Sequence, residues 1–308
     1  MTPPRIAVLL PCYNEEVAVA RTVAGFRAAL PTATVYVYDN NSRDRTVEVA
    51  RAAGAVVRTE RIQGKGAVVR RMFADVDADV YVMADGDATY DPSSAPALVA
   101  RLLGDQLDMV VGNRVHEAAD AYRCGHVLGN RLMTGILARL FGRSFSDIFS
   151  GYRVFSRRFV KSFPSLSAGF EIETEISVHA LELKMPVAEI ATPYFARPEG
   201  SASKLSTYRD GWRILQTIAT LYRIERPLLF FGVIASLLAA LSVVLAIPLA
   251  VTYAETGLVP RFPTAILATG LMILAALAFF AGLILGTVVH GRREMRRLAY
   301  LAYPAPGG

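Results

Sequence analysis

The sequence predicts an α/β protein with a mainly parallel sheet, followed by two transmembrane helices. Short apolar runs rich in Val, Ile and Tyr alternate with helical stretches as far as Asn113. Two long stretches without charge lie towards the C-terminal end, in a chain that is 53% hydrophobic with a mean hydropathy of +0.35. The chain therefore divides into a polar α/β part and a membrane part.

The expected strands and helices of the α/β part alternate along the chain. Strands separated by helices form βαβ units, and such units build parallel sheets. The strands are expected at residues 6–11, 34–40, 55–59, 79–85 and 107–113, and the helices at 15–30, 43–53, 66–75 and 93–103.

Polar residues follow four of the expected strands, at the point where each strand ends. Ligands of parallel α/β sheets bind beyond the carboxyl ends of the strands. We therefore expect these strand ends to meet in one cleft. They read PCYNEE at 11–16, DNNSRD at 39–44, DGDATYD at 85–91 and GNR at 112–114.

Three carboxylates, Asp85, Asp87 and Asp91, crowd the end of the fourth strand. Carboxylates so close together are costly unless a cation neutralises them, and a hard divalent ion takes oxygen ligands and bridges to substrate phosphates. With Gly86 between them, Asp85 and Asp87 are predicted to face one Mg²⁺ or Mn²⁺. The alternative is a solvated turn whose acids cap a helix. Asp91, directly before Pro92, is at such a capping position.

The uncharged stretches between Arg226 and Glu255 and between Arg261 and His290 each exceed the ~20 residues that cross a bilayer. The alternative, core helices of a soluble protein, fits such apolar lengths poorly. Arginines precede the first stretch and follow the second, so the positive-inside rule places both termini in the cytoplasm. We expect the protein in the cell (inner) membrane.

The motifs PCYNEE, DNNSRD, QGKGAVV, DGDATYDP and SGYRVF resemble, in order and spacing, those of family 2 glycosyltransferases of the GT-A fold, which is Rossmann-like and binds nucleotide sugars. With two spans behind it, the chain is similar to polyprenyl-phosphate sugar transferases such as dolichyl-phosphate mannose synthases and bactoprenol glucosyltransferases. The resemblance implies a metal-dependent, inverting transfer of a sugar from a UDP- or GDP-linked donor to undecaprenyl or dolichyl phosphate. The reaction is expected at the cytoplasmic leaflet.

The domains that follow are a cytoplasmic GT-A catalytic domain over 1–204, an interfacial amphipathic helical segment over 205–226, two transmembrane helices with a short outer loop over 227–290, and a basic cytoplasmic tail over 291–308. The net charge of +6 includes no basic run with interleaved aromatics, so nucleic acid is not an expected partner. The expected partners are the donor, the lipid phosphate, the membrane and further copies in a homo-oligomer.

On the donor side, the resemblance implies residues that contact the nucleotide and its phosphates, with Asp85 and Asp87 as metal ligands. Asn40 stands where the family usually has a second acid, so the base stays open between uridine and guanosine. The loop from Arg197 to Lys204 is one residue longer than the family's R-x-x-G-x-S-K pattern. It therefore also stays open which serine of this loop aligns with the serine of the family. The donor-binding residues are Pro11, Tyr13, Glu15, Asp39, Lys65, Asp85, Arg197, Ser203 and Lys204.

On the acceptor side, Arg114, Arg131 and Thr134 match positions that hold the lipid phosphate, and Asp87, Asp147 and Arg131 are the implied catalytic residues. A phosphate monoester has a second pKa of ~6, so it attacks without a strong general base and inverts the donor configuration. Three further acids begin a helix, where they complement its dipole or contribute to the site. They are Glu171, Glu173 and Glu175.

Two other functions remain open. A processive polysaccharide synthase of the same fold usually carries Q-x-x-R-W and more spans, whereas Trp212 here lies in RDGWR. A non-catalytic membrane adaptor that binds nucleotide sugars would release no nucleoside diphosphate when lipid phosphate is added.

Overall fold

The computed structural model describes residues 3–116, 135, 139, 145–165, 172–196, 216, 220 and 223–307. The chain divides into two compact units. We call them the sheet unit, made of Met1–Trp212 together with Met295–Gly308, and the helix-pair unit, Arg213–Glu294. The expected interfacial segment, 205–226, lies almost wholly outside the described residues.

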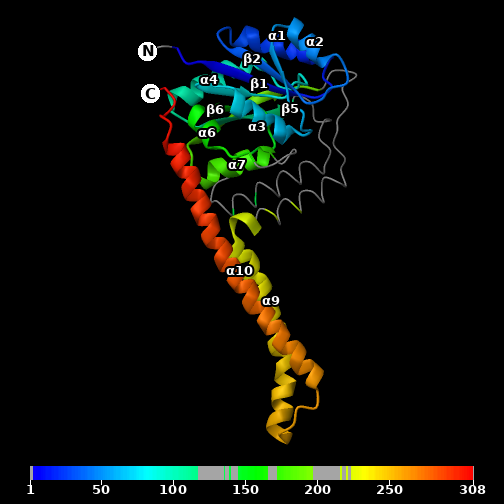
Figure 1. Ribbon diagram of the computed structural model, residues 1–308. Coiled ribbons are helices and arrows are strands. Elements are labelled where there is room, and N and C mark those ends of the chain that lie inside the picture. The colour runs from blue at the N-terminus through cyan, green and yellow to red at the C-terminus, as the bar shows by residue number, and fades with distance from the viewer. Residues whose placement is uncertain are drawn as a thin grey trace. The chain divides into compact units, whose positions relative to one another are not determined.

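The sheet unit is built on a seven-stranded sheet in the order β3-β2-β1-β4-β6-β5-β7 (Figure 1). The neighbours in β3-β2-β1-β4 pair in parallel, as do β5 and β7, whereas β6 runs antiparallel to both β4 and β5. The sheet is therefore mixed, with the predicted parallel arrangement in its first half. The strands are β1 Ile6–Cys12, β2 Thr34–Asp39, β3 Val56–Thr59, β4 Val80–Met83, β5 Met109–His116, β6 Arg153–Ser156 and β7 Val187–Tyr194.

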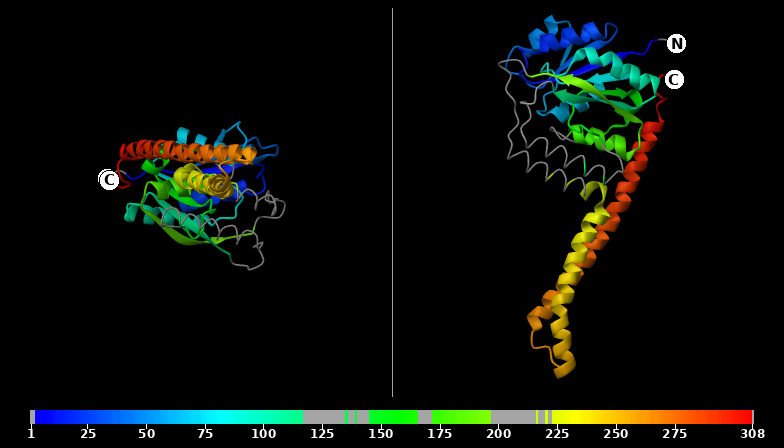
Figure 2. Two further views of the ribbon diagram at one scale, coloured as in Figure 1. Left: turned by 90° about the horizontal axis from the view of Figure 1, so that it is seen from below. Right: turned by 180° about the vertical axis from the view of Figure 1, so that it is seen from behind.

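Helices cover both faces of this sheet (Figures 1 and 2). On one face α1 contacts α2 and α4, and on the other α3 contacts α6 and α7. A sheet covered on both faces needs apolar side chains on both, which explains why all four residues of β4 are buried. The helices are α1 Val19–Ala29, α2 Thr46–Ala52, α3 Lys65–Asp75, the 3₁₀ turn η1 Pro92–Ser94, α4 Ala95–Gly104, α6 Arg157–Ser162 and α7 Ile172–Glu182.

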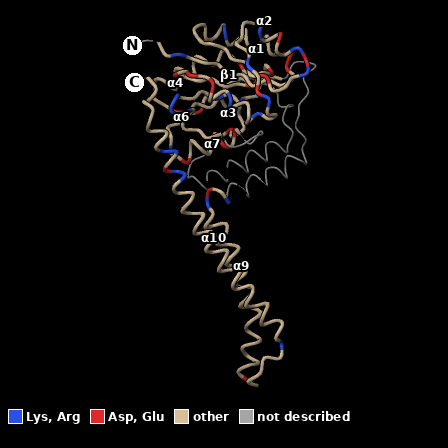
Figure 3. The backbone as a smooth tube through the Cα atoms, viewed as in Figure 1, with Lys and Arg blue, Asp and Glu red and all other residues tan. Residues whose placement is uncertain are grey.

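Two helices, α9 Pro227–Thr256 and α10 Phe262–Leu301, are long and apolar enough to cross a membrane. Their most apolar windows have mean hydropathies of 2.7 and 2.5, and only 11% and 17% of those windows are buried. Core helices of a soluble protein bury most of their apolar residues, so this exposure favours membrane spans. Figure 3 shows that Lys, Arg, Asp and Glu are absent from most of both helices.

Within the helix-pair unit, the buried residues of α10 recur at every seventh position, as in a left-handed helix pair. All four are apolar and three are small, which lets the helices approach closely. The Ser242 hydroxyl of α9 donates to the carbonyl of Ala268 at 2.7 Å and satisfies a polar group among apolar ones. The four residues are Ala268, Ala275, Gly282 and Val289.

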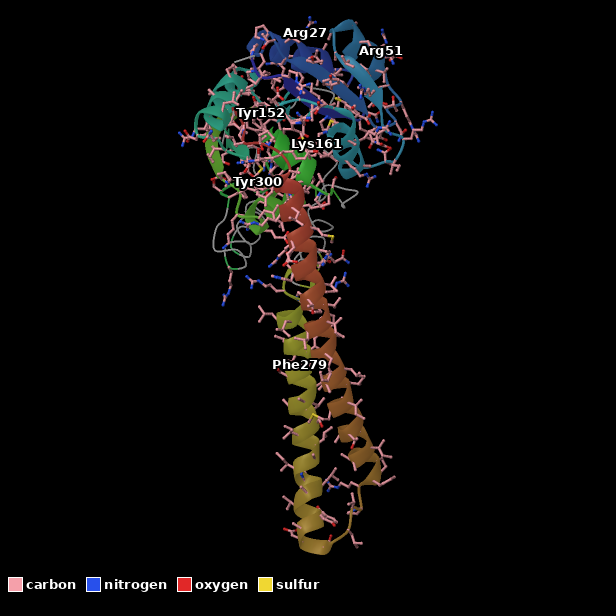
Figure 4. The ribbon with its side chains drawn as sticks, turned by 60° about the vertical axis from the view of Figure 1, so that its left-hand side comes forward. Arg27, Arg51, Tyr152, Lys161, Phe279 and Tyr300 are labelled. Atoms are coloured by element: carbon pink, nitrogen blue, oxygen red, sulfur yellow. The ribbon has the colours of Figure 1, made fainter. Side chains whose placement is uncertain are left out.

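The end of α10 belongs to the sheet unit, from Met295 onward. The Tyr300 hydroxyl donates to Asp108 Oδ2 at 2.9 Å, and the Arg158 guanidinium lies 4.8 Å from the centre of the Tyr300 ring (Figure 4). Arg296 forms an ion pair with Glu182 of α7. Residues expected to form a basic tail therefore contribute side chains to the packing of the sheet unit.

His179 of α7 is buried against two phenylalanines, Phe159 and Phe163, and its Nε2 lies 3.1 Å from the Ser162 hydroxyl. Burial lowers the pKa of this histidine to about 3, so it stays neutral in the folded protein. The unfolded chain takes up the proton near its ordinary pKa of ~6.5. Stability linked to His179 is therefore complete above that pH and is lost as the pH falls towards 3.

We expect the free energy of unfolding to fall by about 1 kcal/mol more in wild type than in His179→Phe between about pH 7.5 and about pH 5.5. Denaturant titration at both pH values measures the difference. Equal pH dependence in the two proteins would show that His179 does not carry it.

Candidate functional site

The carboxyl ends of β1, β2 and β4 lie at one edge of the sheet. Cys12 pairs in register with Asp39, and Leu9 pairs with Met83, two residues before Asp85. The amide of Asn40 donates to the carbonyl of Cys12 at 2.9 Å, which joins the first two strand ends directly. Three of the four predicted strand ends thus meet at one edge of the sheet, whereas residues 112–114, which were wrongly expected to follow a strand, lie within β5.

Lys65 connects two carboxylates at this edge. Its ammonium nitrogen lies 2.5 Å from Asp85 Oδ1 and 2.6 Å from Glu173 Oε1. Burial disfavours the charge of Lys65, but the two carboxylates outweigh burial and raise the pKa of the ammonium above its usual value. Glu173 does lie in the first turn of α7, as expected of an acid that complements the dipole. Its contact with Lys65 also brings it into the site.

Asp87 is buried, with 3% of its surface exposed. Its Oδ1 accepts hydrogen bonds from the Thr89 amide at 3.2 Å and the Thr89 hydroxyl at 2.6 Å. Asp91 is different: it accepts bonds from the Ser93 amide at 3.0 Å and the Ser94 hydroxyl at 2.9 Å, and it caps η1. The capping interpretation therefore holds for Asp91, while Asp85 and Asp87 are left as the pair suited to a cation.

Two glycines pack too closely around this turn to be replaced by a larger residue without a shift. A Cβ on Gly86 would lie 2.3 Å from Cys12 Sγ, and a Cβ on Gly151 would lie 2.9 Å from Asp85 Oδ2. Among the described residues there is no cluster of three or more His, Cys, Asp or Glu side chains that would fully enclose a metal. Mg²⁺ and Mn²⁺ in nucleotide sites commonly take one or two carboxylates and complete their shell with phosphate and water. The donor set of two carboxylates fits such an ion.

Asp39 has one carboxylate oxygen engaged and one without a bond. Oδ2 accepts from the Ser42 amide at 3.2 Å, while Oδ1 is buried and accepts no hydrogen bond within the described part of the chain. A buried acceptor without a donor is costly, which fits a position completed by a ligand. This oxygen of Asp39 can therefore accept a hydrogen bond from a ligand.

Both the nitrogen and the oxygen of the Asn40 side chain form hydrogen bonds within the protein. Its amide nitrogen donates to the carbonyls of Glu60 at 2.9 Å and Ile62 at 2.8 Å, and its oxygen accepts from the Gly64 amide at 2.8 Å. These bonds hold the loop that leads into Lys65. The amide in place of the family's second acid thus has a positioning role that the sequence did not indicate.

The first strand end is tied to the loop after β2. The amide of Glu15 donates to the Thr46 hydroxyl at 2.8 Å, and the amide of Asn14 donates to the Ser42 hydroxyl at 2.8 Å. Pro11 and Tyr13 are partly exposed at the same edge. The structure therefore brings these predicted nucleotide-binding residues close to Asp39.

Arg114 and Asp147 form a bidentate pair, with Nε 2.7 Å from Oδ2 and Nη2 2.8 Å from Oδ1. The guanidinium also lies 5.5 Å from the centre of the Tyr194 ring. Burial disfavours both charges, but their hydrogen bonds outweigh it, so the pKa of Arg114 is raised and that of Asp147 is lowered. Both groups are therefore charged at neutral pH.

Arg153 is fully buried in β6 and was not singled out in the sequence analysis. It donates to the carbonyls of Ser150 at 2.8 Å and Ile148 at 2.5 Å, and to the Ser177 hydroxyl at 2.9 Å. It thus joins the loop after Asp147 to α7. A lone arginine inside the otherwise apolar run YRVF was the available signal. Five other predicted site residues lie outside the described residues: Arg131, Thr134, Arg197, Ser203 and Lys204.

The mixed sheet with these strand ends is a fold of the GT-A type. The chain belongs to glycosyl transferase family 2, whose family profile matches residues 7–163. It is 34% identical over 233 residues to glycosyltransferase AglJ of Haloferax volcanii, covering 75% of this chain and 76% of that protein.

A second relative from Haloferax volcanii, a dolichyl-phosphate hexose transferase, is 27% identical over 221 residues, covering 72% of this chain and 95% of the relative. Among solved structures, a glucosyl-3-phosphoglycerate synthase of Mycobacterium tuberculosis, in complex with Mn²⁺, UDP and phosphoglyceric acid, superposes with a TM-score of 0.58 at 23% identity. That match covers 71% of this chain and 78% of the other. It confirms the predicted fold.

Proposed function

We propose that this glycosyltransferase moves one sugar from a UDP- or GDP-linked donor to a polyprenyl phosphate, with inversion and with Mg²⁺ or Mn²⁺ as cofactor. The observation that carries the proposal is the meeting of Asp39, Asp85 and Asp87 at one sheet edge, where a buried oxygen of Asp39 accepts no hydrogen bond from the described residues. The resemblance to a dolichyl-phosphate hexose transferase over most of its length supports the lipid acceptor.

Each described residue then has a role that its contacts allow. Asp39 accepts from the base or ribose, and the Asn40 clamp keeps the neighbouring loop in place. Asp85 and Asp87 would hold the metal, which when bound neutralises the donor diphosphate and stabilises the departing nucleoside diphosphate. Arg114, kept charged by Asp147, attracts the dianionic lipid phosphate. The acceptor oxygen needs no strong base because it is already deprotonated at neutral pH.

The helix pair is proposed to anchor the enzyme in the cell membrane, with both ends of the chain in the cytoplasm. Neither apolar window of α9 and α10 carries an ionisable group that would line a polar path. Arg223 and Arg226 before α9, and Arg292, Arg293, Arg296 and Arg297 late in α10, support the orientation. The spans would therefore keep the enzyme at the leaflet where the lipid phosphate lies.

Release of nucleoside diphosphate tests this function. Purified protein in vesicles is supplied with UDP- and GDP-linked sugars, with and without polyprenyl phosphate. The proposal expects release that depends on the lipid, and one sugar per lipid by mass spectrometry. No lipid-dependent release with any donor would favour a binding adaptor, and chains of several sugars would favour a processive synthase.

Arg114→Gln is expected to raise the apparent KM for lipid phosphate by about 10- to 100-fold and the KM for the nucleotide sugar much less, because one charged hydrogen-bonding partner of the acceptor is lost. Steady-state kinetics with each substrate varied in turn measures both. Arg101→Gln, which removes an exposed arginine of α4, is the matched control. Equal effects on the two substrates would remove Arg114 from the acceptor site.

A further inference from the structure

Lys65 lies on the carboxylate that the metal would need. Its ammonium nitrogen is 2.5 Å from Asp85 Oδ1, and its side chain is only 11% exposed. Oδ2, the other oxygen of Asp85, faces Gly151, where even a Cβ would come within 2.9 Å. An ammonium and a divalent cation that approach the same carboxylate repel each other. Lys65 and the metal therefore compete for Asp85.

Glu173 gives Lys65 a second partner on α7. The Glu173 Oε1 lies 2.6 Å from the ammonium, and the side chain of Glu173 is 7% exposed. The backbone that carries it is fixed, because the Ser177 hydroxyl donates to the Glu173 carbonyl at 2.9 Å and itself accepts from Arg153 at 2.9 Å. Lys65 can thus leave Asp85 without becoming a buried charge that lacks a partner.

The base of the Lys65 side chain is also fixed. The preceding residue, Gly64, has φ of 130°, a backbone conformation that favours glycine, and its amide donates to Asn40 at 2.8 Å. A shift of the ammonium away from Asp85 therefore requires rotation of the side chain alone. The flexible four-carbon stem of lysine allows such a change.

We propose that Lys65 is an internal counter-ion that occupies the Asp85 carboxylate in the ligand-free enzyme and weakens metal binding until the donor diphosphate arrives. The diphosphate offers the displaced ammonium a new anionic partner, while Glu173 keeps it nearby. Metal and donor then bind cooperatively. This inference rests on the proposed function, because the proposed donor supplies the diphosphate.

Binding of Mn²⁺ to the purified full-length protein tests the inference without any turnover. Free Mn²⁺ is followed by electron paramagnetic resonance, without nucleotide and with UDP or GDP. The double variant Lys65→Met with Glu173→Gln removes one positive and one negative charge, so the net charge of the site stays constant. It is expected to bind Mn²⁺ at least about tenfold more tightly than wild type without nucleotide, and to gain less from added nucleotide.

Lys65→Met alone should also bind Mn²⁺ more tightly than wild type. Because it leaves Glu173 buried without its cation, this single variant can fail to fold, and the double variant keeps the test valid in that case. Lys184→Met, which removes an exposed lysine just after α7, is the control for net charge and should match wild type. Mn²⁺ binding by the double variant that is no tighter than wild type would overturn the inference.

The two proposals fail separately. Lipid-dependent release by wild type, with unchanged Mn²⁺ affinity in the double variant, would refute the counter-ion and keep the function. Tighter Mn²⁺ binding in the double variant, with no lipid-dependent release by wild type, would refute the function and keep the counter-ion.

Discussion

Asp87→Asn is expected to lower sugar transfer by about 10³-fold while the protein stays folded. The substitution keeps the shape of the side chain and an oxygen that can accept from the Thr89 amide and hydroxyl. It removes the negative charge that we assign to metal binding. Turnover of the nucleotide sugar, compared with thermal unfolding of the same preparation, measures the two effects separately.

Asp91→Asn is the matched control, because Asp91 lies in the same turn and caps η1 instead. It should change transfer severalfold at most. A similar loss in both variants would mean that the turn, rather than the charge of Asp87, matters. Wild-type rates in enzyme verified free of metal would contradict the metal assignment itself.

Arg158→Met is expected to lower the free energy of unfolding by about 3–5 kcal/mol. Asp108 is fully buried, and Arg158 Nη2 lies 3.0 Å from its Oδ2. Without the arginine, the carboxylate keeps only the hydroxyls of Ser156 at 2.8 Å and Tyr300 at 2.9 Å among its described side-chain partners. Chemical denaturation in detergent, followed by circular dichroism, measures the loss.

The neighbouring residue provides the control. Arg157 pairs with Asp77 at 3.0 Å, but both side chains are well exposed, at 38% and 52%. An exposed ion pair contributes at most about 1 kcal/mol. Arg157→Met should therefore cost much less than Arg158→Met, and comparable losses would show that the buried carboxylate does not depend on its arginine.

The parallel half of the sheet was predictable because its signals are local. Each strand there is a short apolar run that ends in polar residues, and the predicted helix at 66–75 matches α3 at Lys65–Asp75. The antiparallel β6 was not foreseen, since a four-residue strand with only two apolar residues gives no sign of its direction. Helix α1 begins at Val19 rather than at residue 15 because residues 15–18 form a turn.

The site was predictable only where a residue type and its position already implied the chemistry. The spacing of Asp85 and Asp87 predicts a metal pair, which stays a prediction, and the structure places the predicted donor-binding residue Lys65 beside Asp85. The contact of Lys65 with Glu173 joins residues more than a hundred positions apart, and no periodic pattern encodes it. In the sequence, Asn40 only differed from the acid that the family usually has at this position, which left the base open. In the structure, its hydrogen bonds hold the 60–64 loop in place. Such roles depend on tertiary contacts that a single sequence does not record.

The sheet unit takes residues from both sides of the helix pair, and this fixes the order in which the enzyme can be completed during synthesis. The ribosome makes α9 and most of α10 before it makes Tyr300, whose hydroxyl bonds to Asp108. A nascent chain that has not yet produced both helices therefore lacks that contact. The final packing of the enzyme is thereby delayed until the helix pair has been translated.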